Sequence, residues 1–422
     1  MKEVKQAMEG VKVAEFAYAG VGPQTTRELA EHGATVVRIE SHRAPDPLRM
    51  MSPFRDFVPE LNRSAFGTCY NTQKYSISID LNMAKGLEIA KRVVMWADVV
   101  LDGMTPGTMK KWELDYEGVR NMRPDIIYVS TCQLGQSGPD AAFSGWGYLL
   151  MAMAGFTNVT GWPDRTPLNV IASYTDYIAP WYLVTTLIAA LDYRRRTGEG
   201  MVINQSQLES SLQFFSPALL DYNVNGRIMG RSGNRHPYAA PHGAFPCRAI
   251  EPWTERWVAI AVFSDEEWQA LCKVLGEPDW TKEPEFATLS GRKENEDELE
   301  RLVAEWTEDY TAEQIMAMMQ DAGVSAGVVE TPEDLFNDPQ VKHREHFRLL
   351  EHKVIGWHSY NAPAYRLSKT PCDISKPGPC LGEDNEFVFK EIVGLTDDEI
   401  ANLLIEGVIT TEADAPKIPP VF

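Results

Sequence analysis

The sequence predicts an α/β fold, in which helices cover a parallel sheet, together with a smaller second domain. Residues 11–40 contain a short apolar run, a turn with glycines, an amphipathic segment and another apolar run, which is the order of a β-α-β unit. The same alternation recurs over residues 83–101 and 116–130, and such alternation is typical of parallel sheets. At 422 residues the chain exceeds the size at which one hydrophobic core stops growing, so two domains are expected.

Residues 174–196 predict a buried helix, because the segment YTDYIAPWYLVTTLIAALDYRRR is apolar on most faces. Arginines in its last turn suit the negative end of the helix dipole, and Gly198 and Gly200 supply the stop. A strand over MVINQS and a helix over QLESSLQFF follow.

Residues 223–243 are rich in Gly, Asn, Arg and Pro and show no periodicity, which indicates a linker or a functional loop. The segments beyond it predict the smaller domain: a strand (WVAIAVF), helices over residues 265–276, 295–306 and 312–323, and a strand (VSAGVVE). After Leu367 the chain is rich in proline and is expected to return to the first domain, with one helix over residues 397–404.

Composition excludes several classes of protein. Hydrophobic residues make up 44% and charged residues 24% of the chain, as in an ordinary globular protein. The net charge of −20 and the lack of a basic block argue against a nucleic-acid partner. No signal peptide and no apolar stretch of roughly 18 residues is present, so we expect a cytoplasmic protein without a membrane partner.

The sequence lacks the common cofactor and hydrolase motifs. There is no G-x-G-x-x-G, no P-loop, no G-x-S-x-G and no H-E-x-x-H. The six cysteines form no C-x-x-C pair and have no histidine at zinc-ligand spacing. We therefore expect reduced thiols, no metal, and neither a nicotinamide nor a flavin. The loop around Gly20 and Val21 either offers backbone N–H groups to an anion or is a tight connection between strand and helix.

Asp176 is the candidate for covalent catalysis. It lies where the helix over residues 177–196 is expected to begin, with Pro180 still in the first turn. An aspartate there can cap free N–H groups of the helix. The same position would keep the carboxylate ionised and directed outward, as a nucleophile requires. The residue pattern by itself leaves both roles open.

Further motifs extend over the whole chain. They are Gly22-Pro23, GATVVRIES, NTQKYSI from Asn71, Asp80-Leu81, Ala97-Asp98-Val99, Pro106-Gly107, Tyr128 to Ser130, GQSGP from Gly135, Asp176 ahead of the arginine run and TGEG, Ser232-Gly233-Asn234, Pro241-His242-Gly243, Asp338-Pro339-Gln340 and Leu381-Gly382-Glu383. In these motifs the chain resembles the class III CoA-transferases, the CaiB/BaiF family.

The resemblance implies a Rossmann-like large domain, a smaller α/β domain and an interlocked dimer. Residues 1–211 would form the first part of the large domain, 212–231 a linker and 232–328 the small domain. Residues 329–422 would cross back and complete the large domain. The partner is expected to be a second copy or a related subunit of a heteromer.

The resemblance also gives Asp176 a role. Its carboxylate would attack the thioester of an acyl-CoA to form a mixed anhydride, and the released CoA thiolate would then form an aspartyl-CoA thioester. Coenzyme A, as acyl-CoA, is therefore the expected substrate, and an acceptor carboxylic acid takes the second round. The implied CoA contacts are Gly20, Val21, Ile79, Asp80, Leu81, Asn82, Gly103, Met104, Thr105, Lys111, Ser144 and Trp146. Lys111 could equally be a solvated helix residue, and Trp146 could pack in the core.

Two departures from relatives concern the acyl group. Some relatives have Gln where this chain has Gly20, and some have a run of glycines where this one has residues 231–243. We hypothesise that Arg231, Arg235 or His236 binds a carboxylate of the acyl group. Succinyl-CoA as donor and an aromatic or branched dicarboxylate as acceptor are expected, and the succinyl-CoA:benzylsuccinate CoA-transferase type is one candidate branch.

Three alternatives remain. An acyl-CoA racemase shares the fold, but racemases have a histidine where this chain has Trp146, which cannot exchange a proton. A non-catalytic CoA-binding subunit of a heteromeric transferase would bind without turning over. A ligase would need ATP, for which no phosphate loop is present.

Overall fold

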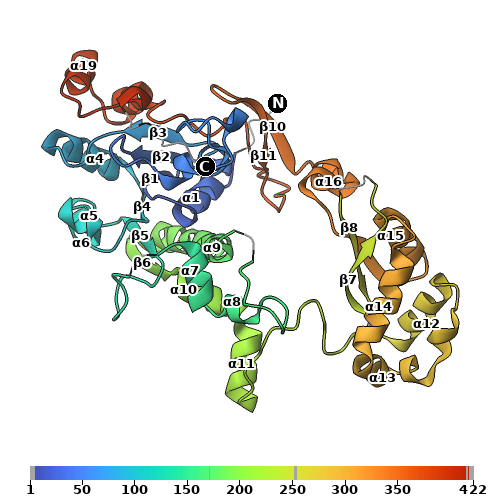
Figure 1. Ribbon diagram of the computed structural model, residues 1–422. Coiled ribbons are helices and arrows are strands. Elements are labelled where there is room, and N and C mark those ends of the chain that lie inside the picture. The colour runs from blue at the N-terminus through green and yellow to red at the C-terminus, as the bar shows by residue number, and fades with distance from the viewer. Residues whose placement is uncertain (1–4, 144, 171, 251–253, 415–416, 418–422) are drawn as a thin grey trace. The chain divides into compact units, whose positions relative to one another are not determined.

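The computed structural model describes residues 5–143, 145–170, 172–250, 254–414 and 417 (Figure 1). The chain divides into two compact units. The large unit contains Met1–Thr157, Asn169–Ile228 and His343–Phe422, and the small unit contains Asn158–Leu168 and Met229–Lys342. The small unit is thus inserted into the large one.

The large unit is built on a six-stranded parallel sheet with the strand order β3-β2-β1-β4-β5-β6. Its strands are β1 (Lys12–Phe16), β2 (Thr35–Glu40), β3 (Tyr75–Ser78), β4 (Val99–Asp102), β5 (Ile127–Cys132) and β6 (Met201–Ser206). The predicted parallel α/β sheet is therefore confirmed. The strand order reverses between β1 and β4, and a doubly wound sheet binds ligands at the carboxyl ends of such strands.

Helices cover both faces of this sheet. The first half of the unit contributes α1 (Val21–Glu31), α2 (Pro47–Met50), α3 (Ala65–Cys69), α4 (Ala84–Trp96), α5 (Thr108–Lys111), α6 (Tyr116–Met122), α7 (Gly147–Met153), α8 (Phe156–Val159), α9 (Tyr174–Thr197), α10 (Gln207–Phe214) and α11 (Ser216–Asn225). Leu29 of α1 and Leu187 of α9 pack on one face with Val129 of β5. Val93 of α4 and Val119 of α6 pack on the other.

The C-terminal segment belongs to the large unit. It begins with the hairpin of β10 (Phe347–His352) and β11 (Gly356–Asn361). It ends with α18 (Asn385–Phe387), a helical turn over Val388–Ile392, and α19 (Asp397–Ile405). Phe389 and Leu403 pack into the core beside α4, and the Ser78 N–H of β3 donates to Asn385 Oδ1 over 2.9 Å. Residues 385–409 therefore complete the edge of the sheet at β3.

The small unit has its own core. An antiparallel sheet joins β7 (His242–Cys247), β8 (Arg256–Ala261) and β9 (Ser325–Val328). Its helices are α12 (Asp265–Val274), α13 (Leu289–Glu294), α14 (Glu296–Thr307), α15 (Ala312–Asp321), α16 (Pro332–Asn337) and α17 (Pro339–His343). Trp268, Phe286 and Ile315 are fully buried between helices and sheet. Short 3-10 turns occupy Asp279–Lys282 and Pro284–Phe286 in this unit, and Arg55–Phe57 and Glu412–Asp414 in the large unit.

Helix α9 differs from its prediction in two respects. It begins at Tyr174 rather than after Asp176, with Ser173 as its N-cap. It is also buried on one side only, because Trp181, Tyr182 and Ile188 remain exposed in the single chain. Within the described residues, no helix combines the length and the apolar character needed to cross a membrane.

Candidate active site

A pocket lies at the carboxyl edge of the parallel sheet. The loops that follow β1, β4 and β5 form its walls, and the start of α10 after β6 contributes one residue. The lining consists of residues 18–22, 103–106, 131–133, 141, 143, 145–147, Asp176 and Gln207. This is the position at which doubly wound sheets bind ligands, because the flanking loops diverge there.

The Asp176 carboxylate is the one charged group in the described lining of this pocket. It belongs to the first turn of α9, and its backbone N–H donates to the Ser173 carbonyl over 2.7 Å. Among the described residues, no hydrogen bond or ion pair to this carboxylate is formed, and Ser173 makes no side-chain cap bond either. Capping of the helix therefore does not account for Asp176, and its oxygens are available to a ligand.

Burial raises the pKa of the Asp176 carboxyl to about 7. The sequence suggested instead that the helix start would keep this group ionised. The difference arises because desolvation disfavours the charged form and no cation lies near enough to offset it. A carboxyl group with this pKa is about half ionised at neutral pH, and its anion is weakly solvated, which favours nucleophilic attack.

Two glycines allow the backbone to approach Asp176 closely. A Cβ atom at Gly147 would lie 2.7 Å from Asp176 Oδ2 and 2.3 Å from Ser173 Cβ. A Cβ atom at Gly20 would lie 3.2 Å from Asp176 Cβ. Any side chain at Gly147 would therefore displace the carboxylate or the start of α9, and one at Gly20 would crowd it.

A second acidic residue supports the β4 wall of the pocket. Asp102 ends β4, and its Oδ1 accepts the Met104 N–H over 2.8 Å. Its Oδ2 accepts the Ser130 hydroxyl over 3.2 Å, and burial raises the pKa of Asp102 to about 6. Asp102 thus fixes the turn that presents Gly103 and Met104 to the pocket.

The comparisons with known proteins agree with this geometry. Residues 8–385 match the model of CoA-transferase family III. The chain belongs to CoA-transferase family III. The transferase is 31% identical over 95% of its length, and 98% of the relative, to the succinyl-CoA--D-citramalate CoA-transferase of Chloroflexus aurantiacus. It is 29% identical over 93% of its length, and 97% of the relative, to the succinate--glutarate CoA-transferase of Agrobacterium fabrum.

A solved structure supports the fold of the transferase as well. The crystal structure of a CaiB/BaiF family protein from Brucella suis superimposes with a TM-score of 0.84 at 29% identity. The match covers 92% of the transferase and all of that chain. The expected family, the α/β fold class and the assignment as a class III enzyme are thereby confirmed.

Six of the expected CoA contacts line the same pocket as Asp176. They are Gly20, Val21, Gly103, Met104, Thr105 and Trp146. Trp146 is 61% exposed, so it does not pack in the core of the transferase. Ser144 lies outside the described residues.

The remaining expected contacts lie away from the pocket lining. Ile79 and Leu81 are buried in the core beside β3, and Asp80 is buried while its carboxylate accepts the Asn82 N–H over 2.9 Å. Lys111 ends α5 and is exposed. The side chains of Ile79 and Leu81 therefore stabilise the fold, and the Asp80 carboxylate is paired with Arg43 at 2.7 Å.

The three expected acyl-binding residues belong to the small unit, and they differ in whether a carboxylate neutralises their charge. Arg235 forms ion pairs with the carboxylates of Asp297 and Glu300 of α14, at 2.8 Å for Glu300. Arg231 donates to the carbonyl oxygens of Trp162 and Asn158 over 3.2 and 3.4 Å. Within the described part of the chain no carboxylate pairs with Arg231, so its charge remains available. His236 Nδ1 accepts the Tyr238 N–H.

Sequence reasoning missed several pocket residues, among them Thr131, Gln133 and Gln207. Thr131 lies near the carboxyl end of β5, Gln133 follows β5 and Gln207 follows β6, and carboxyl ends of parallel strands lie at one edge of a sheet. This rule could have identified them. The described residues contain no group of three or more His, Cys, Asp or Glu side chains arranged for a metal ion.

Proposed function

We propose that this transferase moves CoA from succinyl-CoA to a dicarboxylic acid, with the Asp176 carboxylate as the covalent relay. The observation that carries the proposal is a partly buried carboxylate without a protein partner, in a pocket at the switch point of the sheet. The two curated relatives support the substrate class, because both are named as CoA-transferases of succinate or succinyl-CoA with a further dicarboxylic acid.

The reaction consists of four acyl transfers. An oxygen of Asp176 attacks the thioester carbonyl, the carbon–sulfur bond breaks, and CoA leaves as the thiolate with a succinyl–aspartyl anhydride in place. The thiolate then attacks the Asp176 carbonyl carbon and expels succinate, which leaves an aspartyl-CoA thioester. The acceptor carboxylate attacks this thioester and expels the thiolate. Finally the thiolate attacks the acceptor's carbonyl carbon, which yields the acceptor-CoA and restores Asp176.

Burial of Asp176 favours both the attack of its carboxylate on the donor thioester and the survival of the intermediates. Water competes with every acceptor for an anhydride or a thioester, so a pocket that desolvates the carboxylate also protects the intermediates from hydrolysis. The same burial raises the pKa of Asp176, so that less of the carboxyl group is ionised at neutral pH. The enzyme must bind its donor with the carboxylate ionised, which predicts activity that increases as the pH rises through about 7.

The CoA moiety is proposed to extend from Asp176 along the β1 and β4 loops. Thioester and pantetheine would contact Gly20, Val21, Gly103, Met104 and Thr105, with the Trp146 ring as an exposed apolar wall. The nucleotide would extend toward the polar groups of residues 79–82 and the ammonium group of Lys111 beyond the pocket rim.

Arg231 is the preferred candidate for binding the distal carboxylate of the acyl group. The described lining of the Asp176 pocket contains no Lys, Arg or His, so a cation for this carboxylate must come from elsewhere. Arg231 has an available charge, whereas acidic residues of α14 already neutralise Arg235. Guanidinium groups bind carboxylates through paired hydrogen bonds.

An interlocked dimer, or a heteromer with a related subunit, is the proposed assembly. Exposed apolar side chains on α9 and α11 support it, namely Trp181, Tyr182, Leu220, Tyr222 and Val224. Apolar side chains gathered on neighbouring helices favour association over exposure to water. Size-exclusion chromatography with light scattering of the purified chain tests this proposal, and a monomer at micromolar concentration would contradict it.

The decisive experiment follows heavy oxygen. The mechanism leaves one oxygen of the acceptor carboxylate in Asp176, so an acceptor labelled with heavy oxygen should label the peptide that contains Asp176 after turnover. Asp176→Ala should bind CoA but neither transfer it nor become labelled. Asp192→Asn, at the exposed end of the same helix, is the matched control and should behave like the unaltered enzyme.

The outcomes separate the alternatives. Turnover without label in Asp176 would contradict the covalent relay. CoA binding without exchange by the purified chain would instead indicate a non-catalytic subunit that needs a partner. A racemase would invert its substrate without any acceptor, and the described pocket lining offers no histidine to serve as its second proton carrier.

A further inference from the structure

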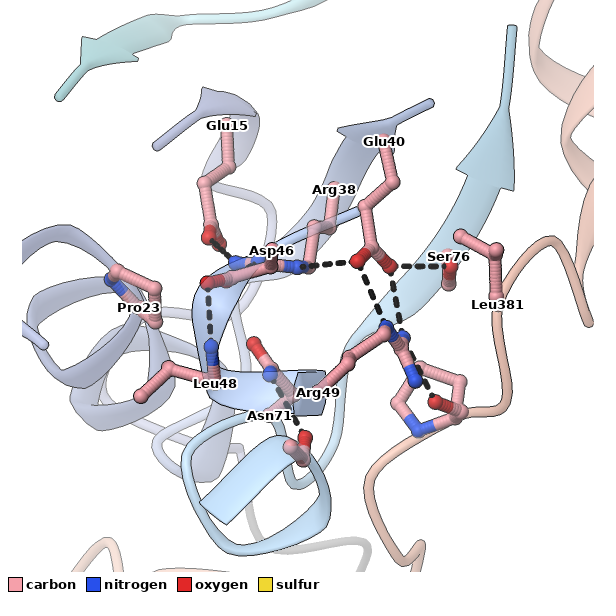
Figure 2. A network of polar contacts seen from close by, with 12 residues as sticks. Glu15, Pro23, Arg38, Glu40, Asp46, Leu48, Arg49, Asn71, Ser76 and Leu381 are labelled. Atoms are coloured by element: carbon pink, nitrogen blue, oxygen red, sulfur yellow. Dashed lines mark hydrogen bonds and ion pairs between the residues drawn. The ribbon is translucent and has the colours of Figure 1, made fainter. Parts of the chain in front are cut away.

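Figure 2 shows a buried network of charged side chains. The network reaches the first loop of the pocket through Asp46, which accepts the Ala19 N–H. Three carboxylates and three cations take part, so the charges balance, and each side chain is at most 1% exposed. The members are Glu15, Arg38, Glu40, Asp46, Arg49 and Lys74.

Arg38 of β2 is the centre of this network. Its guanidinium forms ion pairs with Glu15 of β1 and with Asp46, and its Nε lies 3.5 Å from Glu40 Oε1. Arg49 in turn donates to both oxygens of Glu40, over 2.8 and 2.7 Å. These pairs fix the position of Asp46 through the rigid strands of the sheet rather than through a loop.

Asp46 joins the network to the pocket. Its Oδ1 accepts two backbone N–H groups, from Ala19 over 3.0 Å and from Leu48 over 2.9 Å. The Leu48 bond caps α2, whereas the Ala19 bond reaches the loop of residues 18–22 that lines the pocket. One carboxylate thus connects the ionic network with the pocket wall.

Ala19 has an unusual backbone conformation. Its φ is +60°, in the left-handed region that residues with a side chain avoid. Such a conformation persists only where surrounding contacts impose it. The contact available here is the Asp46 bond to the Ala19 N–H, and the next residue, Gly20, is the one whose Cβ would lie 3.2 Å from Asp176 Cβ.

We propose that Asp46 is a positioning residue for the transfer reaction. It holds Ala19 in its left-handed conformation and thereby the adjoining Gly20 against Asp176, and Arg38 holds Asp46. The inference rests on the proposed function, because the reaction that it supports is acylation of Asp176. Without the bond, Ala19 would relax to a negative φ and the turn would move relative to the carboxylate. A displacement of about 1 Å near reacting atoms can slow a reaction about a hundredfold.

The test compares Asp46→Ser with Ser76→Ala. A serine at position 46 can still cap α2 but is too short to reach both Ala19 and Arg38. Ser76 belongs to the same network, since its hydroxyl donates to Glu40 Oε2 over 2.7 Å and accepts the Gly382 N–H, yet it has no contact with the pocket loop. Both variants weaken the network, and only one releases the turn.

The readout is the rate of Asp176 acylation in a single turnover with succinyl-CoA, trapped with hydroxylamine, beside the melting temperature and the affinity for CoA. We expect both variants to melt at a lower temperature. Asp46→Ser should acylate about tenfold to a hundredfold more slowly, and Ser76→Ala at the normal rate. Asp46→Asn, whose amide oxygen can still accept from Ala19, should recover most of the rate. Equal rates for the two main variants, or no recovery with asparagine, would overturn the proposal.

A measurement on the unaltered enzyme gives an independent check. The Ala19 amide should be strongly protected from hydrogen exchange, and rapid exchange there would contradict the role of Asp46. The two proposals fail differently. Absence of acylated Asp176 in the unaltered enzyme would overturn the proposed function, whereas normal acylation of both the unaltered enzyme and Asp46→Ser would overturn only the role of Asp46.

Discussion

Replacing the Asp176 carboxylate by an amide should stabilise the fold while it abolishes transfer. Burial raises the pKa of Asp176 from 3.8 to about 7. Stability that is fully present below pH 3.8 is therefore lost as the pH rises through about 7, because the folded protein binds the proton more tightly than the unfolded chain. The pKa difference corresponds to at most about 4 kcal/mol. Since the side chain is only partly buried, water screens it, and we expect about 2 kcal/mol.

The side-chain amide of the Asp176→Asn variant does not ionise. The free energy of unfolding that the variant gains over the unaltered protein should therefore depend on pH. Urea unfolding at pH 8 should show the full gain of about 2 kcal/mol, and at pH 5.5 a smaller gain. Asp192→Asn, which is exposed at the other end of α9, controls for loss of an acidic side chain and should gain nothing. An Asp176→Asn variant that is no more stable than the unaltered protein at pH 8, or equally stabilised at both pH values, would refute the electrostatic argument.

Three further predictions concern activity. The rate constant kcat/KM of the unaltered enzyme should rise with pH and level off above about 7, as Asp176 ionises; a flat profile between pH 6 and 8 would contradict this. Gly147→Ala should lower kcat about a hundredfold, since its Cβ would lie 2.7 Å from Asp176 Oδ2, and a normal kcat would show that the carboxylate can move aside. Arg231→Ala should raise the KM of the acceptor about tenfold or more, whereas Arg235→Ala should leave it within about twofold. The reverse order would assign the role to Arg235 instead, and no change when Arg231, Arg235 and His236 are all replaced would exclude this loop from acyl binding.

Most of the large unit could be predicted from hydrophobic periodicity. Strands β1, β2 and β6 and helix α6 coincide with their predicted segments almost to the residue, because their apolar positions follow the period of a buried helix or strand. Strand β7 was not predicted, since Pro246 interrupts its pattern and marks an edge strand. The β10–β11 hairpin was not predicted either, because neither of its strands forms a continuous apolar run.

The start of α1 shows how local chemistry shifts a boundary. The amphipathic segment TTRELAEHG predicts a helix from Thr25, but the helix begins at Val21 with Pro23 in its first turn. Proline is tolerated there because the first N–H groups of a helix have no partner in any case. The glycines before Pro23 are typical of a loop. Whether they belong to the loop or to the helix is decided only by where the folded sheet places this turn.

The candidate site was partly predictable for a different reason. The carboxylate of Asp176 and the β4 loop followed from motifs that are local in sequence. The role of Asp46 did not, because it depends on contacts between β1, β2 and the pocket loop that no spacing reveals. The same holds for the raised pKa of Asp176, since sequence position indicates the helix dipole but gives no measure of desolvation.

The return of the C-terminal segment to β3 has a consequence for how the enzyme is made. The Arg49 guanidinium donates to the carbonyl of Pro379 over 3.0 Å, across 330 residues of chain. During synthesis this contact, and the sheet edge around it, stay incomplete until Pro379 has left the ribosome, and contacts so distant in sequence form slowly. A growing chain therefore already contains Asp176, and the residues that position the turn beside it, long before the edge of the sheet at β3 is complete.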